Sequence, residues 1–286
     1  MAGATPISGG KWRGFASGQG AEASRGAAWV EQNCQSRASA WLRFGWCCAF
    51  GLGMVTALAQ GGPRAQAERA YQTRQKQFEA QPKNPEAAWQ LGRACFDLGE
   101  LATNSAERAE FAEQGINACR QALAVGSNSA PAHYYTGLNL GELARTRSIG
   151  ALKLVSQMEH ELTAARDLDE HFDFAGPDRS LGLLYRDAPS LISIGSRSKA
   201  RQHLRRAIEL APEYPENRLN LIDSCFKWGD RNDARRELTA LEAIWPKARQ
   251  KLSGPEWAAS WEDWQGQLEA LKKKMEEASK LESPRH

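Results

Sequence analysis

The sequence predicts an all-α protein, a solenoid of helical pairs packed one after another. Three observations support this prediction. No segment alternates apolar and polar residues with a period of two over a useful length, so strands are not expected. Apolar positions 34 residues apart match in the second half of the chain, and three glycines before them recur every 45 residues. One helical pair cannot bury its apolar face alone, so such units stack on their neighbours.

The 34-residue period links Pro212 to Pro246 and is shared by the apolar positions of successive helices. The matching pairs are Ala200 with Ala234, Leu204 with Leu238, and Ala207 with Leu241. A period of 34 with small residues at the helix crossings is the signature of the tetratricopeptide repeat. Proline cannot continue a helix, so each of these prolines is expected to end the second helix of a repeat. Pro82 is expected to do the same after a helix over 66–80.

Three upstream repeats are expected to open near 85, 130 and 178. Each carries glycine at the small position of its first helix, at Gly92, Gly137 and Gly182. A glycine here lets the second helix approach closely and leaves no room for a side chain. Because the spacing of 45 exceeds the consensus, we expect the extra residues between the two helices, around 100–110, 146–156 and 187–196. About four repeats with long inter-helix inserts are therefore predicted.

The C-terminal segment has a different pattern, with apolar residues spaced alternately four and three apart. This spacing predicts one amphipathic helix of about 25 residues, which begins after Ser253–Glu256. A solenoid needs an end cap, so a capping helix is favoured over a self-associating coil. The stripe consists of Trp257, Trp261, Trp264, Leu268, Leu271, Met275 and Ala278.

A leader is indicated by one uncharged apolar run, from Phe44 to Ala59. Arg37 and Arg43 supply a positive flank before it, and the run ends in an A-x-A cleavage pattern. We expect a signal peptide that is cleaved after Ala59, a mature chain that begins at Gln60, and a periplasmic or secreted location. The alternative is a transmembrane anchor, although the run is short for a membrane span.

The expected organisation is a leader with a disordered extension over 1–59, a tetratricopeptide-repeat domain over 60–250, and the C-terminal capping or association helix over 251–286. The first 30 residues are rich in Gly, Ala and Ser and show no periodicity. Since 59 residues is long for a leader, the true start is expected further in, near Val30.

Charge and cysteine content exclude some classes of function. The leader holds five of the 37 Lys and Arg residues and two of the 34 Asp and Glu residues, so residues 60–286 carry 32 of each and no net charge. A region without net charge lacks the basic surface that nucleic-acid binding usually requires. Residues 60–286 contain three cysteines, Cys95, Cys119 and Cys225. An odd number favours buried free thiols over a framework of disulfides. A Cys95–Cys119 disulfide is the alternative.

The sequence contains no familiar catalytic or cofactor motif, and neither an enzyme nor a cofactor is expected. HExxH, GxSxG, GxGxxG and the P-loop pattern are all missing from it. The acidic cluster over Asp167–Asp173 superficially resembles a calcium loop. Phe172 stands where such a loop needs glycine, and no bidentate glutamate follows at the right spacing. A polar helix end is therefore expected there, and no metal site.

The candidate binding surface is the concave face, which the first helices of stacked pairs line. Its mixture of aromatic and arginine residues suits an extended peptide, or a small ligand with an acid group and an apolar body. The alternative is that these residues belong to the core. The predicted site consists of Trp89, Arg93, Phe96, Tyr134, Arg179, Leu183 and Arg186; the same positions elsewhere hold Leu138, Leu219, Asp223 and Phe226.

Arg179 and Arg186 are the strongest candidates in this set. They are seven residues apart, so they share one face of a helix and flank Leu183. Two guanidinium groups around an apolar step would clamp a carboxylate. The competing interpretation pairs both arginines with acids of the Asp167–Asp173 cluster.

One family resemblance is carried by the run LDEHFDFAGPDRSLGLLYRDAPSLISIGSRSKARQHLRRAIELAPEYPENRLNL over 168–221 and by HYYTGLNLGELAR over 133–145. The chain over about 80–220 resembles the T components associated with tripartite ATP-independent periplasmic (TRAP) transporters. The resemblance implies a periplasmic, non-enzymatic helical-repeat protein that forms homo-oligomers and associates with the solute-binding subunit of the transporter. The sequence departs from the family in lacking a lipobox cysteine, which argues against lipid tethering.

Overall fold

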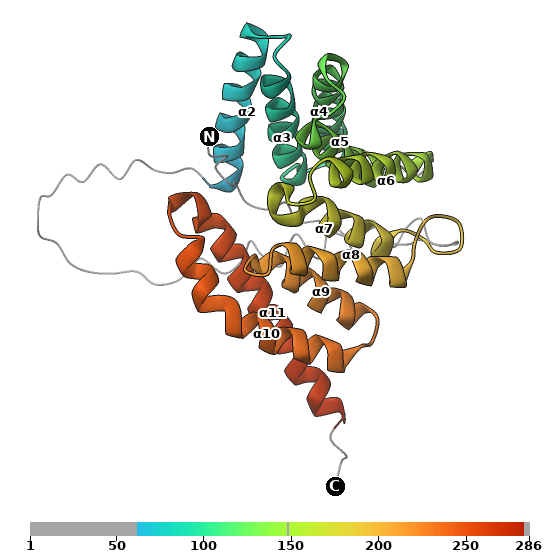
Figure 1. The fold of residues 1–286 in the computed structure, drawn as a ribbon, viewed down its shortest axis with the longest axis vertical. Helices are drawn as coiled ribbons and strands as arrows, with labels where there is room; N and C mark the ends of the chain where they lie inside the picture. Colours follow the sequence, from blue (N-terminus) through green and yellow to red (C-terminus); the bar gives the residue numbers. More distant parts are fainter. Residues whose placement is uncertain (1–61, 148, 283–286) are drawn as a thin grey trace, which may run out of the picture. The chain divides into compact units, whose positions relative to one another are not determined.

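The computed structural model describes residues 62–147 and 149–282, and the predicted leader lies outside them. The described chain is all-α and contains no strand, as the sequence predicted (Figure 1). None of its helices is long and apolar enough to cross a membrane. The elements are α2 (Pro63–Ala80), α3 (Pro85–Glu100), α4 (Ser105–Val125), α5 (Ala130–Arg145), α6 (Ala151–Leu168), α7 (Phe172–Asp187), α8 (Arg197–Leu210), α9 (Pro215–Lys227), α10 (Arg231–Lys251), η1 (Pro255–Trp257) and α11 (Ala258–Glu282).

The helices pack in adjacent pairs, with α3 on α4, α5 on α6, α7 on α8 and α9 on α10. The helix α2 packs on α3 ahead of the first pair, and α11 packs on α9 after the last. The first helices of successive pairs also touch, α3 with α5, α5 with α7 and α7 with α9. This arrangement confirms the prediction of a helical-repeat solenoid with about four repeats.

Helix starts follow from short polar residues and prolines in the sequence. The side chain of Asn84 accepts a hydrogen bond from the Glu86 amide at 2.9 Å, and Pro85 takes the first helical position of α3. Asn104 caps α4 through the Glu107 amide, also at 2.9 Å. Such caps satisfy amides that the first helical turn leaves without a partner. The helix ends agree with the proline expectation at Pro82 and Pro212, since α2 and α8 stop two residues before them.

Pro246 does not end its helix, so the expectation for this proline was wrong. The helix α10 continues through Pro246 to Lys251. An interior proline removes one backbone hydrogen bond and strains the preceding turn. Burial of Ala248 and Leu252 in the core beside the C-terminal tryptophans holds the last turn in place and offsets that loss.

The inserts are shorter than predicted, because much of the extra sequence is helical. The turns inside the first three pairs cover only 101–104, 146–150 and 188–196. The remaining residues lengthen the second helix, which has 21 residues in α4 and 18 in α6 against 14 in α8. Only the third pair therefore carries the long connection that the spacing predicted.

The three glycines spaced 45 residues apart lie where the two helices of a pair cross. A methyl group at Gly92 would collide with the Cys119 thiol of α4, and one at Gly137 would come within 2.9 Å of Leu162 in α6. One at Gly182 would come within 2.7 Å of Leu204 in α8. The close approach expected from the sequence is therefore present in all three pairs.

The C-terminal apolar stripe is buried against the last repeat, as a capping helix would be. Trp264 is 1% exposed and contacts Tyr214 edge-on, with ring centroids 5.2 Å apart. The indole of Trp261 donates a 2.6 Å hydrogen bond to the carbonyl of Leu252. Trp257, Leu268, Leu271 and Met275 are buried in the same cluster. No part of this stripe from Trp257 to Met275 is left open for a partner.

We expect Gly182→Ala to destabilise the fold by about 1–3 kcal/mol, because the new methyl group meets Leu204 and its backbone nitrogen, 3.1 Å away. Gly266→Ala is the matched control, since a methyl group there meets no atom within 4 Å. It lies inside α11, where alanine is the better helix former by about 1 kcal/mol. Urea denaturation of the two variants measures both effects. Equal shifts would show that Gly182 does not lie at a tight crossing.

Candidate functional site

The third pair begins with an unusual backbone. Asp173, Phe174 and Ala175 all have positive φ values, of 49°, 55° and 62°, although none of them is glycine. L-residues avoid this left-handed conformation, which costs roughly 1–2 kcal/mol for each residue. The right-handed part of α7 starts only after this turn. Other interactions must therefore hold the turn in place.

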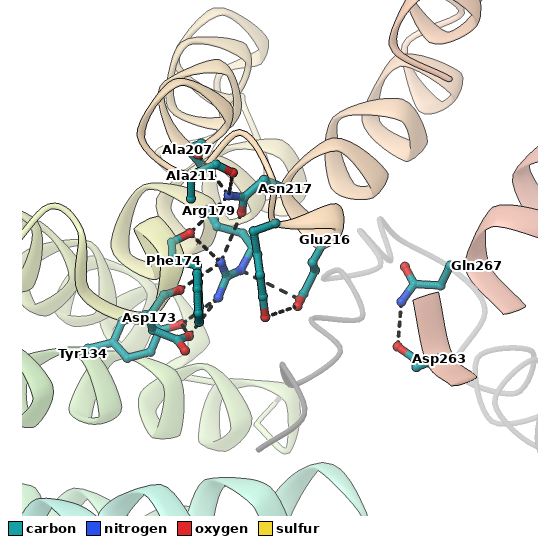
Figure 2. A network of polar contacts seen from close by, with 11 residues as sticks. Tyr134, Asp173, Phe174, Arg179, Ala207, Ala211, Glu216, Asn217, Asp263 and Gln267 are labelled. Atoms are coloured by element: carbon teal, nitrogen blue, oxygen red, sulfur yellow. Dashed lines mark hydrogen bonds and ion pairs between the residues drawn. The ribbon is translucent and has the colours of Figure 1, made fainter. Parts of the chain in front are cut away.

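Arg179 supplies most of these interactions, as Figure 2 shows. Its Nη1 donates to the carbonyls of Asp173 and Phe174, each at 3.2 Å, and its Nη2 donates to the Asp173 carboxylate at 2.8 Å. The side chain is only 4% exposed. A guanidinium can satisfy several acceptors at once because its donors lie in one rigid plane. The turn is thus fastened by a single buried cation.

The same arginine joins three successive helical pairs. Its Nη1 also donates to Asn217 of α9 at 3.1 Å, and Asn217 in turn donates to the carbonyl of Ala207 in α8 at 2.9 Å. From the second pair, the Tyr134 hydroxyl donates to Asp173 at 3.0 Å. Side chains of α5, α7 and α9 therefore meet at one point, which we call the Arg179 network.

Glu216 is the second carboxylate that contacts Arg179 in the Arg179 network. Its carboxylate lies 3.8 Å from Arg179 Nε and accepts a 3.1 Å hydrogen bond from the Tyr214 hydroxyl. The Arg179 guanidinium stacks over the Tyr214 ring, 5.2 Å from its centroid. Burial raises the pKa of Glu216, and the charge of Arg179 opposes that rise. Burial also works against charge on Arg179, but Glu216 and its other neighbours keep its pKa well above the usual value.

The structure places most of the predicted site residues inside the protein. Phe96, Tyr134 and Leu183 are each 3% exposed, and Leu138 and Leu219 are buried as well. The structure does not bring the two arginines to one ligand. Arg179 pairs with Asp173, as the competing interpretation expected, whereas Arg186 is held by Asp187 at 2.6 Å and Asp223 at 3.3 Å. Ligand binding by these residues stays a prediction.

The accessible part of the predicted site lies on α3. Trp89 and Arg93 are both partly exposed. The Trp89 ring stacks on Tyr135 with centroids 5.9 Å apart and an interplanar angle of 3°. The Arg93 guanidinium lies 5.9 Å from the centre of the same Tyr135 ring. A pair of stacked aromatic rings with a cation beside it is a common contact surface for a peptide.

Two acids that follow on the same helix, Asp97 and Glu100, are not among the predicted site residues. Burial raises the pKa of Asp97 to about 6; the charge of Arg93 opposes that rise and the charge of Asp173 adds to it. Burial, together with the charge of Glu142, raises the pKa of Glu100 well above its usual value. Both were predictable in principle, because Asp97 and Glu100 lie four and seven residues after Arg93 and so share its helix face. Carboxylates thus line this face beside Trp89 and Arg93.

Neither the acidic cluster nor the cysteines form a reactive site in the described residues. Asp173 forms an ion pair with Arg179, and Glu170 forms one with Arg206. No group of three His, Cys, Asp or Glu side chains in the described part of the chain is arranged to hold a metal ion. Cys95, Cys119 and Cys225 are buried free thiols, so the Cys95–Cys119 disulfide is not formed. Burial raises the pKa of Cys95 to about 12, which keeps it protonated and unreactive.

Comparison with known proteins agrees with this architecture. The crystal structure of a thermophilic TPR protein in Thermus thermophilus is similar to 72% of this chain and 91% of that chain, with 18% sequence identity and a TM-score of 0.53. This chain is a TPR-like helical-repeat protein. The crystal structure of MamA is a weaker likeness, with a TM-score of 0.44 and 18% identity over 65% of this chain and 93% of that chain.

Sequence comparison adds one match to part of the chain. The family described as Regulator of microtubule dynamics protein 1-3 matches residues 53–173, which is less than half of the length. No curated protein matches the sequence significantly. Neither the thermophilic TPR protein nor the matching family is described as transporter-associated, so the resemblance to TRAP T components gains no support from them.

We expect Arg179→Ala to cost about 3–5 kcal/mol, because it leaves Asp173 and the buried Glu216 without their cation and frees the left-handed turn. Arg206→Ala is the control: Arg206 is 45% exposed and pairs with Glu170 and Glu209 at the surface. Surface pairs are worth no more than about 1 kcal/mol. Urea denaturation compares the two. A loss for Arg179→Ala as small as that for Arg206→Ala would contradict the role of the Arg179 network.

Asp97 should make the fold less stable as the pH rises. Its pKa is about 6 in the folded protein against 3.8 as the ordinary value, so the folded state binds this proton more tightly than the unfolded state. The stabilisation is complete below about pH 4 and is lost by about pH 6. Asp97→Asn should therefore gain stability relative to wild type across this window, as measured by urea denaturation at successive pH values.

Glu107 provides a control of opposite sign. Its ion pair with Arg64 lowers its pKa to about 2, so its contribution is present at neutral pH and is lost as the pH falls. Glu107→Gln should lose stability relative to wild type at neutral pH. If Asp97→Asn shows no pH-dependent difference between pH 4 and 6, the pKa of Asp97 is not raised in the folded protein.

Proposed function

We propose that this protein is a non-enzymatic scaffold that binds a partner protein along the first helices of its repeats. The observation that carries the proposal is the partly exposed strip of Trp89, Arg93 and Asp97 on α3, in a fold whose other apolar stripes are buried. Stacked helical pairs commonly present such strips as extended binding surfaces. The strip combines an aromatic platform with charges of both signs, which suits an extended peptide.

A small ligand with an acid group is less favoured than a peptide. Arg179 and Arg186 were the expected anchors for its carboxylate, and both are already paired with carboxylates of the protein. The half-exposed face of α3 carries the carboxyl groups of Asp97 and Glu100 beside Arg93, so carboxyl groups outnumber the cation there. We therefore propose a peptide that presents a basic residue and an apolar side chain.

The finer proposal follows the family resemblance: an exported scaffold that associates with the solute-binding subunit of a TRAP-type transporter and forms homo-oligomers. The alternative is a general cell-envelope adaptor. The match of residues 53–173 to the Regulator of microtubule dynamics family adds a cytoskeletal regulator as a further candidate.

The binding proposal is tested by chemical crosslinking in cells that express the full chain, followed by affinity capture of the protein with its bound partners. We expect Arg93→Glu to reduce the captured partner at least tenfold, because it reverses the charge beside the Trp89–Tyr135 stack. Arg120→Glu, at an exposed position of α4, is the matched control and should capture as wild type does. Equal capture by both variants would exclude the α3 strip as the binding surface. A solute-binding subunit, another envelope protein or tubulin among the captured proteins distinguishes the three candidates.

The proposed location is outside the cytoplasm, since Arg37 and Arg43 precede the apolar run and basic flanks stay on the cytoplasmic side. Sequencing the N-terminus of the purified protein tests the fate of the leader. A chain that begins at Gln60 has lost a signal peptide, whereas an intact run in the membrane fraction shows a retained anchor. Recovery of residues 60–286 from the cytoplasm would contradict export.

A further inference from the structure

An ion-pair cluster where α8 and α10 begin contains more cations than anions. We call it the arginine cluster; its members are Arg197, Arg201, Arg205, Asp230, Asp233 and Arg236. Asp230 immediately precedes α10 and pairs with Arg197 at 2.5 Å and also with Arg201. Both of these arginines lie in the first two turns of α8.

Asp233, in the first turn of α10, is shared by three arginines. Its carboxylate lies 2.5 Å from Arg201 Nη1 and 2.6 Å from Arg236 Nη2. Arg205, one turn after Arg201, lies 3.7 Å from the same carboxylate. Because Arg201 also reaches the other aspartate, these ion pairs bring all members of the cluster together at one place. The arginines outnumber the aspartates there, so the cluster carries a net positive charge.

Two of the arginines are not needed to hold the helices together. Arg201 contacts both aspartates, so this side chain alone joins α8 to the start of α10. The side chains of Arg205 and Arg236 are 51% and 69% exposed, and both share Asp233 with Arg201. Exposed ion pairs of this kind contribute little to stability. Because a guanidinium has several N–H donors, both side chains retain donors beyond those that Asp233 uses.

The start of α10 adds to the positive potential of the cluster. Asp230 is the N-cap residue of this helix, but its side chain makes no capping hydrogen bond. An aspartate at this position usually accepts hydrogen bonds from the amides of the first turn. Here Arg197 and Arg201 hold its carboxylate instead. The positive end of the helix dipole therefore lies beside the surplus arginines.

We propose that the arginine cluster is a second docking surface, which binds an acidic segment of a partner protein. Its excess of positive charge complements an anionic partner. A guanidinium fork matches a carboxylate, and Arg197 and Arg201 already hold Asp230 in this way. Arg205 and Arg236 are the exposed arginines that would hold the carboxylates of the partner. The peptide proposed for α3 presents a basic residue, so this second surface takes a different segment and does not depend on that proposal.

A bilayer and a nucleic acid suit the arginine cluster less well than an acidic segment. A bilayer gains affinity from inserted apolar groups as well as from charge. The ring beside the cluster, Trp228, lies under the guanidinium groups of Arg197 and Arg201, 5.5 and 5.0 Å from its centre. A nucleic acid needs cations along an extended backbone, whereas residues 60–286 have no net charge and this excess is local.

Fluorescence anisotropy of a fluorescein-labelled hexaglutamate peptide, titrated with the full chain, tests the proposal. The double variant Arg205→Glu, Arg236→Glu should bind the peptide about tenfold more weakly than wild type, because it reverses the surplus charge. The matched control is the double variant Arg69→Glu, Arg120→Glu, which makes the same change of net charge at exposed positions of α2 and α4. This control should bind as wild type does.

A second variant predicts a gain of affinity, which a folding defect cannot produce. Asp233→Asn removes one of the two anions and releases the arginines that share it, so it should bind hexaglutamate about threefold more tightly. Glu242→Gln is its control, since it makes the same change of net charge but pairs with Lys272, outside the cluster. It should leave the affinity unchanged.

Several outcomes would overturn the proposal. Equal losses in the two double variants, or equal affinities for Asp233→Asn and Glu242→Gln, would show that the cluster is not the binding surface. Failure of wild type to bind hexaglutamate would exclude an acidic segment. If phosphatidylglycerol vesicles or oligothymidylate bind in place of the peptide and lose affinity in the Arg205→Glu, Arg236→Glu variant, the cluster serves a membrane or a nucleic acid instead.

Discussion

The buried guanidinium of Arg179 is the constraint on which the third and fourth repeats depend. It holds in place three residues with left-handed backbone conformation at the start of α7, and it contacts Asn217 and Glu216 on α9. Tyr134 on α5 reaches the same carboxylate of Asp173. A repeat protein is ordinarily held together by contacts between neighbouring pairs alone. Here one polar network ties three successive pairs.

Close helix crossings are the second constraint, and they are apolar. Gly92, Gly137 and Gly182 each let the first helix of a pair touch a side chain of the second. The larger two of the four clusters of buried residues extend over α3 to α8 and over α7 to α11, so the third pair belongs to both. The Arg179 network lies in this shared pair. Apolar packing within pairs and polar contacts between them therefore meet where the two clusters join.

The α3 strip remains available for function once the core is accounted for. It offers Trp89, Arg93 and Asp97, which are partly exposed, to a partner protein. The C-terminal tryptophans do not serve this purpose, because they are buried on α9 and its neighbours.

The sequence by itself determined the all-α fold, the helical pairs and the glycine crossings, because helix period and small residues act locally or at fixed spacing. It also marked Trp89, Arg93 and Arg179 as members of one face. It did not determine that Arg179 and Arg186 are internal cations, that Pro246 lies inside a helix, or that its surroundings raise the pKa of the partly buried Asp97. Those outcomes depend on burial and on charges from distant helices, such as Glu216 and Asp223, which only the tertiary structure brings into contact.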